Sequence, residues 1–268
     1  MTGPVAVPVT TRRAWVEQIM GMPISIHLRG SAPESRREAA VAGVYAELRE
    51  VDAIFSTYRE ESDVRRLDRG EVTVEECDPR VREVLDLCAR ATDATGGYFD
   101  VRLPAADGSL HLDPSGLVKG WAAERAARRL SGLAGDDHYL NAGGDIALRC
   151  ASPGAPPWRI GLEDPYRPGA LLGVLPLASG GIATSGTAHR GAHIVDPTTG
   201  RTAGGLRAVT VTGPSLLWAD VYATAAFARG REGLDWLAGL DGYQALAVLD
   251  DGTVRMTDGM REAFQPIR

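Results

Sequence analysis

The sequence has few cysteines and no long hydrophobic run. Its three cysteines, Cys77, Cys88 and Cys150, form no CxxC pair and cannot all be joined in disulfide bonds, which favours buried thiols in a reducing compartment. No uncharged apolar stretch approaches the roughly 20 residues of a membrane-spanning helix, and no apolar segment of signal-peptide length stands near the start. We therefore expect a cytoplasmic protein without a membrane span.

Several common catalytic and nucleotide-binding motifs are also missing. The chain contains no GxxxxGK[ST] loop, no GxGxxG between a strand and a helix, no HExxH and no GxSxG. These absences argue against P-loop, Rossmann, zinc-hydrolase and α/β-hydrolase sites. The formal net charge of −6 disfavours a general role in coating nucleic acid, which requires a broad basic surface.

What remains is the composition of an ordinary globular protein, with 44% hydrophobic and 24% charged residues in 268. One core can serve a chain of this length, and no low-complexity linker divides it. We expect a flexible N-terminal segment over residues 1–15 and a single domain over residues 16–268.

Helical patterns gather in the first half of the chain and strand patterns in the second. Apolar residues three and four positions apart, together with residues that favour helix starts and ends, predict helices over residues 31–55, 78–95, 118–130, 216–228 and 233–240. Alternation of apolar and polar residues predicts strands over residues 17–28, 139–141, 146–148, 158–162, 171–177, 181–184, 193–195 and 208–212. A last hairpin is expected from residue 243, with its turn at Asp251-Gly252. Residues 56–70 have the composition of a polar loop. The order favours an α+β fold with a mainly antiparallel sheet.

Asp220 and Thr224 form the first candidate site. They lie four residues apart in a small-residue helical segment, so their side chains project from one face. A carboxylate and a hydroxyl are hard oxygen ligands of the kind that magnesium takes. The alternative is structural, with Asp220 capping a helix and Thr224 bonded back to a carbonyl.

A second candidate is the turn over residues 112–121, where Gly116 precedes a predicted helix. Backbone N–H groups at a helix start can bind phosphate, Lys119 could offer a positive charge to a pyrophosphate, and Asp113 could accept hydrogen bonds from a ring or sugar. An ordinary turn with a helix cap would have the same sequence.

Three further segments each have a functional and a structural interpretation. His193, in a strand that leads into a turn, could serve as a base at neutral pH or could be a packed strand histidine. Tyr58 could stack on a flat ligand or cover the edge of the core. The glycines of residues 141–146 indicate either close backbone approach to a ligand or a bulge.

Together and in this order, these segments resemble the ApbE family of flavin transferases. The matching segments are residues 20–22, 56–59 with Ser62, 95–100, 113–120, 141–146, 183–186, 193–200 and 220–225. The resemblance implies a T-fold-like α+β architecture. It also implies an enzyme that transfers the FMN moiety of FAD to a Thr or Ser hydroxyl of an acceptor flavoprotein, with release of AMP and with magnesium as the metal.

The resemblance also assigns roles to residues. Asp220 and Thr224 fall on the side-chain metal ligands, and Gly116 falls where a backbone carbonyl completes the metal site. The positions that line the FAD pocket are Met20, Tyr58, Tyr98, Phe99, Asp100, Asp113, Lys119 and His193. Either His193 or Asp220 could receive the proton of the attacking hydroxyl. The alternatives are a magnesium-dependent FAD pyrophosphatase, which uses water in place of the acceptor, and a non-catalytic FAD-binding protein.

Overall fold

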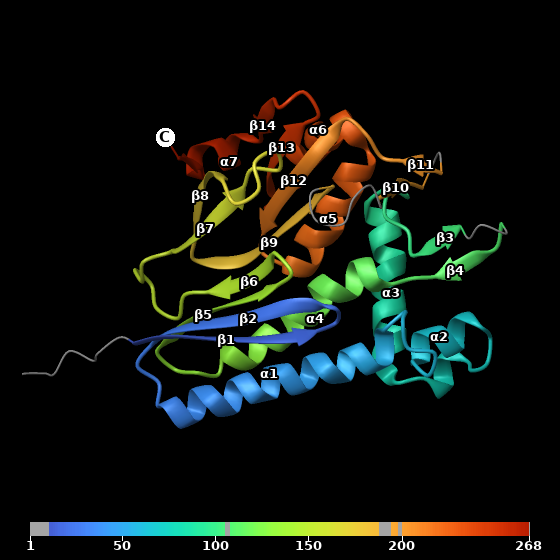
Figure 1. The fold of residues 1–268 in the computed structure, drawn as a ribbon, viewed down its shortest axis with the longest axis horizontal. Helices are drawn as coiled ribbons and strands as arrows, with labels where there is room; N and C mark the ends of the chain where they lie inside the picture. The colour runs from blue at the N-terminus through green and yellow to red at the C-terminus, as the bar shows by residue number, and fades with distance from the viewer. Residues whose placement is uncertain (1–10, 105–107, 188–193, 198–199, 268) are drawn as a thin grey trace, which may run out of the picture.

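The computed structural model describes residues 11–104, 108–187, 194–197 and 200–267. Its centre is an eight-stranded sheet in the order β1-β2-β5-β6-β9-β12-β13-β14, in which all neighbours are antiparallel (Figure 1). The strands are β1 Thr11–Ile19, β2 Met22–Gly30, β5 Asp136–Ala142, β6 Asp145–Arg149, β9 Ser179–Gly186, β12 Leu206–Gly213, β13 Gln244–Leu249 and β14 Val254–Met256.

Three small sheets accompany the large one. They pair β7 Trp158–Glu163 with β8 Leu171–Leu177 and β15 Gln265–Pro266, β3 Arg102–Pro104 with β4 Leu110–Leu112, and β10 Val195–Asp196 with β11 Arg201–Thr202. The helices are α1 Glu34–Phe55, α2 Asp63–Asp68, α3 Pro79–Ala94, α4 Ser115–Leu130, α5 Leu216–Ala228, α6 Gly233–Ala238 and α7 Asp258–Ala263, with short 3-10 turns η1 Val74–Glu76 and η2 Gly230–Glu232.

The large sheet is covered on both faces. Because strand side chains alternate, Leu140 and Ala147 enter the larger core with α1, α4 and α5, whereas Ile146 and Leu148 enter a smaller core with β7 and β8. Figure 1 shows α1 and α4 along the β1–β2–β5 part of the sheet and α5 beside β9 and β12. The prediction of an α+β fold with a mainly antiparallel sheet and packed helices is confirmed.

The single strand predicted over residues 17–28 is wrong. The chain reverses at Met20-Gly21, where both residues have positive φ, 56° and 69°, as a two-residue hairpin turn of type I′ requires. Apolar and polar residues alternate on both sides of the turn, so the two-residue period of the sequence does not reveal where the chain reverses. Residues 11–15, expected in a flexible segment, pair with β2 as the first half of β1.

The predicted helices correspond to α1, α3, α4, α5 and α6, and α4 begins at Ser115, three residues before the expected start. The loop predicted over residues 56–70 is wrong in part, because it contains α2. The N-cap of α2 is Ser62, whose hydroxyl accepts a hydrogen bond from the backbone N–H of Arg65 at 3.3 Å. The final hairpin is confirmed as β13 and β14, and α7 and β15 follow it unpredicted.

The three cysteines are free, as expected. Cys77 and Cys88 are buried, and Cys150 is partly exposed. Burial raises the pKa of the Cys88 thiol to about 12, so this group stays protonated and unreactive at neutral pH. Across the described residues, no helix combines the length and the apolar character that crossing a bilayer requires.

Candidate functional site

The α4–α5 contact brings two predicted site residues together. A Cβ at Gly120 of α4 would lie 3.1 Å from Cβ and Oδ2 of Asp220 and 3.2 Å from Cα of Leu217, so a side chain here would crowd this approach and glycine suits it. Glu124, one turn further along α4, fixes the start of α5, because its Oε2 accepts the backbone N–H of Leu217 at 3.0 Å. The two helices are therefore held close enough for Lys119 to reach Asp220.

A charged cluster lies at this junction, which we call the Lys119 cluster: Lys119, Asp145 and Asp220. Lys119 Nζ forms an ion pair with Oδ2 of Asp145 at the start of β6 and lies 3.3 Å from Oδ1 of Asp220. Both carboxylates are 2% exposed, and Lys119 is the only lysine in the sequence. Asp145 also accepts the backbone N–H of Thr184 at 3.0 Å. Pairing of this kind is what makes buried charge tolerable.

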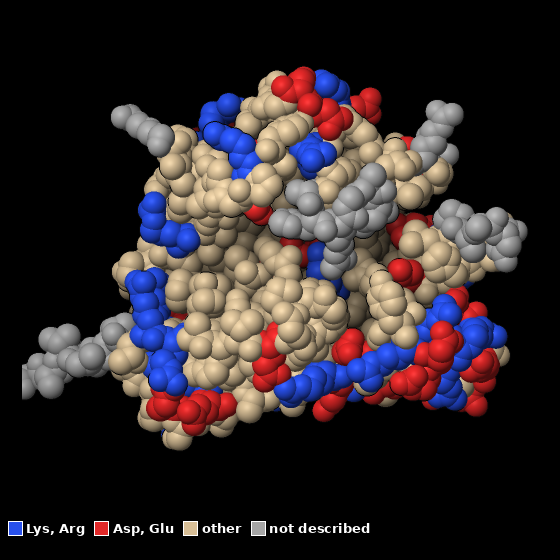
Figure 2. Space-filling model, in the orientation of Figure 1, with Lys and Arg blue, Asp and Glu red and all other residues tan. Residues whose placement is uncertain are grey.

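The second predicted ligand, Thr224, lies one helical turn beyond Asp220. Its hydroxyl is 3.2 Å from that of Ser185 on β9. The capping role considered for Asp220 is wrong, since Ser215 is the N-cap of α5 and Asp220 lies inside the helix. Helix α5 therefore carries a buried carboxylate and, one turn later, a hydroxyl that meets the hydroxyl of Ser185 on β9. Figure 2 shows this side of the molecule hollowed near its centre, with acidic and basic atoms visible in the hollow.

These oxygen donors fit magnesium in their chemistry. The described residues include no group of three or more His, Cys, Asp or Glu side chains placed to hold a metal ion. Magnesium does not need one, because it is usually held by one or two carboxylates, with waters and substrate phosphates in the remaining positions. Asp220 and Thr224 supply a carboxylate and a hydroxyl, and Gly116 lies four residues before Gly120, on the same side of α4.

The predicted aromatic residues lie after α3. The guanidinium carbon of Arg229 is 4.0 Å from the ring centroid of Tyr98, and Nη2 of Arg229 donates to the carbonyl of Thr95 at 2.7 Å. The hydroxyl of Thr95 accepts the backbone N–H of Phe99 at 3.0 Å. Phe99 is buried, and its ring is 3.5 Å from the place of a Cβ on Gly116. The end of α3 is thus fixed beside the start of α4.

Asp100 and Asp113 make local hydrogen bonds. Oδ1 of Asp100 accepts the backbone N–H of Arg102, and Oδ1 of Asp113 accepts that of Ser115, each at 2.9 Å. The backbone N–H of Asp113 donates to the carbonyl of Val101 at 2.8 Å, which joins the two segments. These contacts match the turn-forming alternative for Asp113. Within the described residues, Oδ2 of Asp113 has no hydrogen-bond partner, so it can accept a hydrogen bond from a ligand.

Two further predicted residues lie away from these contacts. Met20 is in the β1–β2 turn at the same end of the sheet as Asp145, since Ile24 pairs with Ala142 and Ala142 with Asp145. Tyr58 follows α1 and is 96% exposed, and no contact within the described residues joins it to the Lys119 cluster. His193 lies outside the described residues.

Three residues of this region were missed as site residues in the sequence: Asp145, Ser185 and Arg229. Asp145 directly follows the Gly143-Gly144 turn, in a segment already noted for its glycines, and Ser185 lies in a segment that matches the family. Both could have been predicted as site residues by including the polar side chains within or beside the segments that match the family. Arg229 had no such signal, because its contact with Tyr98 joins residues 131 positions apart.

The sequence is similar to those of known flavin transferases. The sequence profile described as the ApbE family matches residues 20–107 and 102–247. The FAD:protein FMN transferase of Rhodobacter capsulatus is 30% identical over 200 residues, which cover 71% of this chain and 38% of that protein. The protein of the same name from Salmonella typhimurium is 27% identical over 153 residues, covering 53% and 44%. The matched part spans less than half the length of these relatives.

Solved structures agree in fold. The ApbE protein of Thermotoga maritima has a TM-score of 0.80 at 21% identity, covering 94% of this chain and 99% of that one. The apo form of the flavinyl transferase ApbE of Pseudomonas stutzeri has a TM-score of 0.79 at 24% identity, covering 95% and 98%. Since the family profile extends over most of the sequence and the fold is shared along nearly its whole length, the chain belongs to the ApbE family.

Proposed function

We propose that this protein transfers the FMN moiety of FAD to a Thr or Ser hydroxyl of an acceptor flavoprotein and releases AMP. Family membership and the names of the relatives support this reaction. The observation that carries it is the Lys119 cluster, in which a buried carboxylate on α5 lies 3.3 Å from the only lysine and one turn before the hydroxyl of Thr224. An ammonium group and hard oxygen ligands together suit a pyrophosphate substrate.

In this reaction the acceptor oxygen forms a bond to the phosphorus of the FMN half, and the bond from that phosphorus to the bridging oxygen of AMP breaks. Lys119 neutralises charge on the pyrophosphate, and the hydroxyl proton passes to His193 or Asp220. Magnesium, held by Asp220, Thr224 and the carbonyl of Gly116, would supply further charge neutralisation when bound. Catalysis then depends mainly on positioning and electrostatics.

The flavin contacts are part of the same proposal. Met20, Tyr58, Tyr98 and Phe99 provide apolar and aromatic surface, and Asp100, Asp113, Lys119 and His193 provide polar contacts. Tyr98 suits this role because Arg229 covers one face of its ring and fixes its orientation. The acceptor is a flavoprotein with a Thr or Ser attachment site. A cytoplasmic location stays a prediction from the sequence.

The proposal is tested by incubating the purified protein with FAD, magnesium chloride and a candidate acceptor. We expect the acceptor to become covalently fluorescent and to gain the mass of FMN less one water. The amount of labelled acceptor should rise in parallel with the amount of AMP released. An acceptor whose attachment residue is replaced by alanine is the control and should stay unlabelled. Cleavage of FAD to FMN and AMP without labelling would instead identify a pyrophosphatase, and unchanged FAD would identify a binding protein.

The Asp220→Ala variant tests the role of the cluster in this reaction. We expect it to lower metal-dependent turnover by about a hundredfold or more, because charge stabilisation at the reacting phosphate is lost. Flavin affinity, measured by fluorescence titration, should change far less, since the flavin ring contacts lie on other elements. Equal loss of turnover and flavin affinity would contradict the assignment of Asp220 to the metal.

A further inference from the structure

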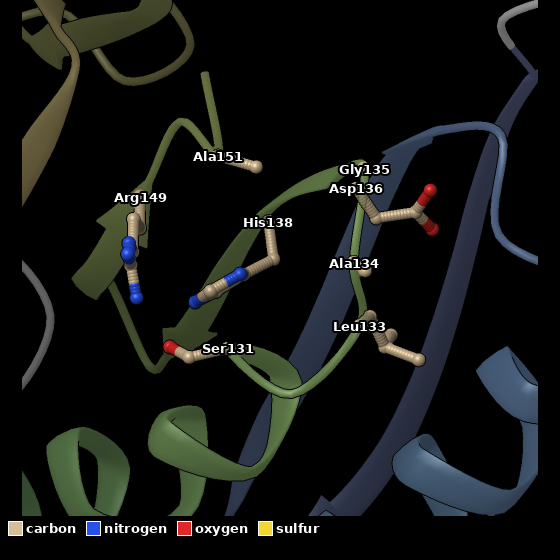
Figure 3. A pocket seen from close by; sticks show the side chains of 8 residues that line it. All are labelled: Ser131, Leu133, Ala134, Gly135, Asp136, His138, Arg149 and Ala151. Carbon is tan, nitrogen blue, oxygen red and sulfur yellow. The ribbon is translucent and has the colours of Figure 1, made fainter. Parts of the chain in front are cut away.

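A polar cavity lies at the far end of α4 from the Lys119 cluster. It has a volume of about 280 Å³, and Ser131, His138 and Arg149 line it (Figure 3). An adjoining hollow of about 200 Å³ shares these three residues and adds Ser179. Lys119 and Ser131 are twelve residues apart along α4, a separation of roughly 18 Å at 1.5 Å per residue. The cavity is therefore separate from the proposed flavin site.

Three of the lining side chains form a row across the sheet. In the β5–β6 ladder His138 pairs with Arg149, and in the β6–β9 ladder Arg149 pairs with Ser179. Directly paired residues point to the same face, with their Cβ atoms about 5 Å apart. This is the face that carries Leu140 and Ala147 into the larger core, so the row lies at the edge of the helix-covered side.

His138 is the unusual member of the row. It is 4% exposed, and within the described residues its Nδ1 has no hydrogen-bond partner. Leaving a buried polar atom without a partner is unfavourable, so a small movement that lets a ligand or water reach Nδ1, which has less than 1 Å² of exposed surface, would be favoured. Figure 3 shows the ring pointing into the cavity between Arg149 and Ser131. Burial, with a smaller contribution from Arg149, lowers the pKa of His138 to about 4, so the neutral ring offers one donor and one acceptor.

Arg149 brings a positive charge to the cavity beside His138. Among the described residues, no carboxylate pairs with it. The two carboxylates that line the hollows are committed to other groups: Asp136 accepts from Nε of Arg37 at 2.5 Å, and Glu124 accepts from the hydroxyl of Ser215 at 2.6 Å. A guanidinium group with free donors at a cavity mouth favours a ligand with several acceptor oxygens.

The end of α4 does not oppose such a ligand strongly. A helix C-terminus repels anions through its unsatisfied carbonyl groups. Here the carbonyls of Arg128, Arg129 and Leu130 accept the backbone N–H groups of residues 131, 132 and 133. With these carbonyls satisfied, their repulsion of an anion is reduced.

We propose that this cavity and the adjoining hollow together bind a small phosphate-bearing anion, with Arg149 pairing with its charge and His138, Ser131 and Ser179 contributing hydrogen bonds. A phosphate group presents enough acceptor oxygens for these donors at once, whereas a carboxylate presents two. The cavity is larger than a phosphate group, so both inorganic phosphate and the phosphate of a small monoester satisfy the same chemistry. The inference stands independently of the flavin reaction.

The test follows the His138 ring by NMR in the full chain with ¹⁵N-labelled histidine. The sequence has five histidines, so the spectrum is simple, and the His138→Gln variant assigns the resonance. Inorganic phosphate and ribose 5-phosphate are titrated separately at constant ionic strength. We expect a saturable shift of the His138 resonance in the millimolar range or below, and the tighter ligand identifies the source of the phosphate. Because the reporter is local, phosphate bound near Lys119 does not imitate this shift.

Two arginine variants complete the design. Arg149→Gln should weaken phosphate binding by about tenfold or more, as loss of a charge-assisted hydrogen bond does. The matched control is Arg159→Gln, an exposed arginine on β7, which belongs to the layer on the opposite face of the sheet. The absence of a saturable His138 shift with either ligand, or equal affinity in the two arginine variants, would overturn the proposal. Arg149 is exposed, so its replacement should leave the fold intact, and where His138→Gln does not fold, isothermal titration calorimetry compares phosphate affinity in the two arginine variants.

Discussion

Lys119 Nζ lies 3.3 Å from Oδ1 of Asp220 and also pairs with Asp145, so one ammonium group joins two buried carboxylates from different elements. Lys119 is on α4, Asp220 on α5 and Asp145 on β6, so the contact ties the helical layer to the sheet at the candidate site. The same group that is proposed to meet the pyrophosphate is therefore also part of the structure that positions Asp220.

Replacing Lys119 with methionine should destabilise the protein by about 3 kcal/mol or more, because two buried carboxylates would remain without their cation. Urea unfolding at neutral pH, followed by circular dichroism, measures the change. The triple variant Lys119→Met, Asp145→Asn, Asp220→Asn serves as the control and should recover most of the loss, since no buried charge remains. A loss below about 1 kcal/mol in the single variant would mean that the pairing contributes no more than an exposed ion pair.

The close approach of α4 and α5 predicts opposite effects for two glycine-to-alanine changes. At Gly120 the added Cβ would meet Asp220 and the backbone of Leu217 at 3.1–3.2 Å, so we expect a loss of about 1–3 kcal/mol. At Gly43, inside α1, the nearest atom is Cδ of Arg129 at 3.8 Å, so alanine should stabilise by about 0.5–1 kcal/mol. Urea unfolding of both variants is the measurement, and equal signs would contradict the argument.

Replacing Tyr58 should weaken flavin binding without changing the stability of the protein. Its side chain is 96% exposed, so Tyr58→Ala should leave the unfolding temperature unchanged. If the ring stacks on the flavin, affinity for FAD should fall by about five- to tenfold, which corresponds to a contribution near 1 kcal/mol. Fluorescence titration with FAD measures the affinity, and Tyr58→Phe, which keeps the ring, is the matched control. Unchanged affinity in Tyr58→Ala would remove this residue from the flavin site.

Much of the fold follows from local pattern. The Asp78-Pro79 start signal and the apolar spacing of α3 place that helix to within a residue, and Asp251-Gly252 places the last turn. The β1–β2 turn was missed because Met20 is not a residue that favours positive φ, and only the pairing with β2 determines its conformation. Helix α2 was missed because it has six residues and one buried side chain, which is too few to show the apolar spacing of a helix.

The site was predictable only in part for a related reason. Asp220 and Thr224 lie on one helix, so their spacing shows that they share a face. The ion pair from Lys119 to Asp145 joins a helix to a strand 26 residues later, and no local pattern encodes it. The same holds for Ser185 and Thr224, which meet across β9 and α5. Tertiary packing, not sequence period, brings these groups together.

The buried His138 predicts a pH dependence of stability. Its pKa is lowered from 6.5 to about 4 by burial, so between these values the unfolded chain binds more protons than the folded one. The free energy of unfolding should therefore fall as the pH drops from about 6.5 to about 4, by up to roughly 3 kcal/mol from this group. The difference between wild type and His138→Gln, measured by urea unfolding at several pH values, isolates this contribution from those of the carboxylates and His27. As the pH falls, wild type should lose stability relative to His138→Gln. If the variant is the less stable protein at pH 7, the difference should shrink, and if it is the more stable one, the difference should grow. Parallel stability curves over this window would show that His138 takes up its proton equally in the folded and unfolded chain, in conflict with its burial.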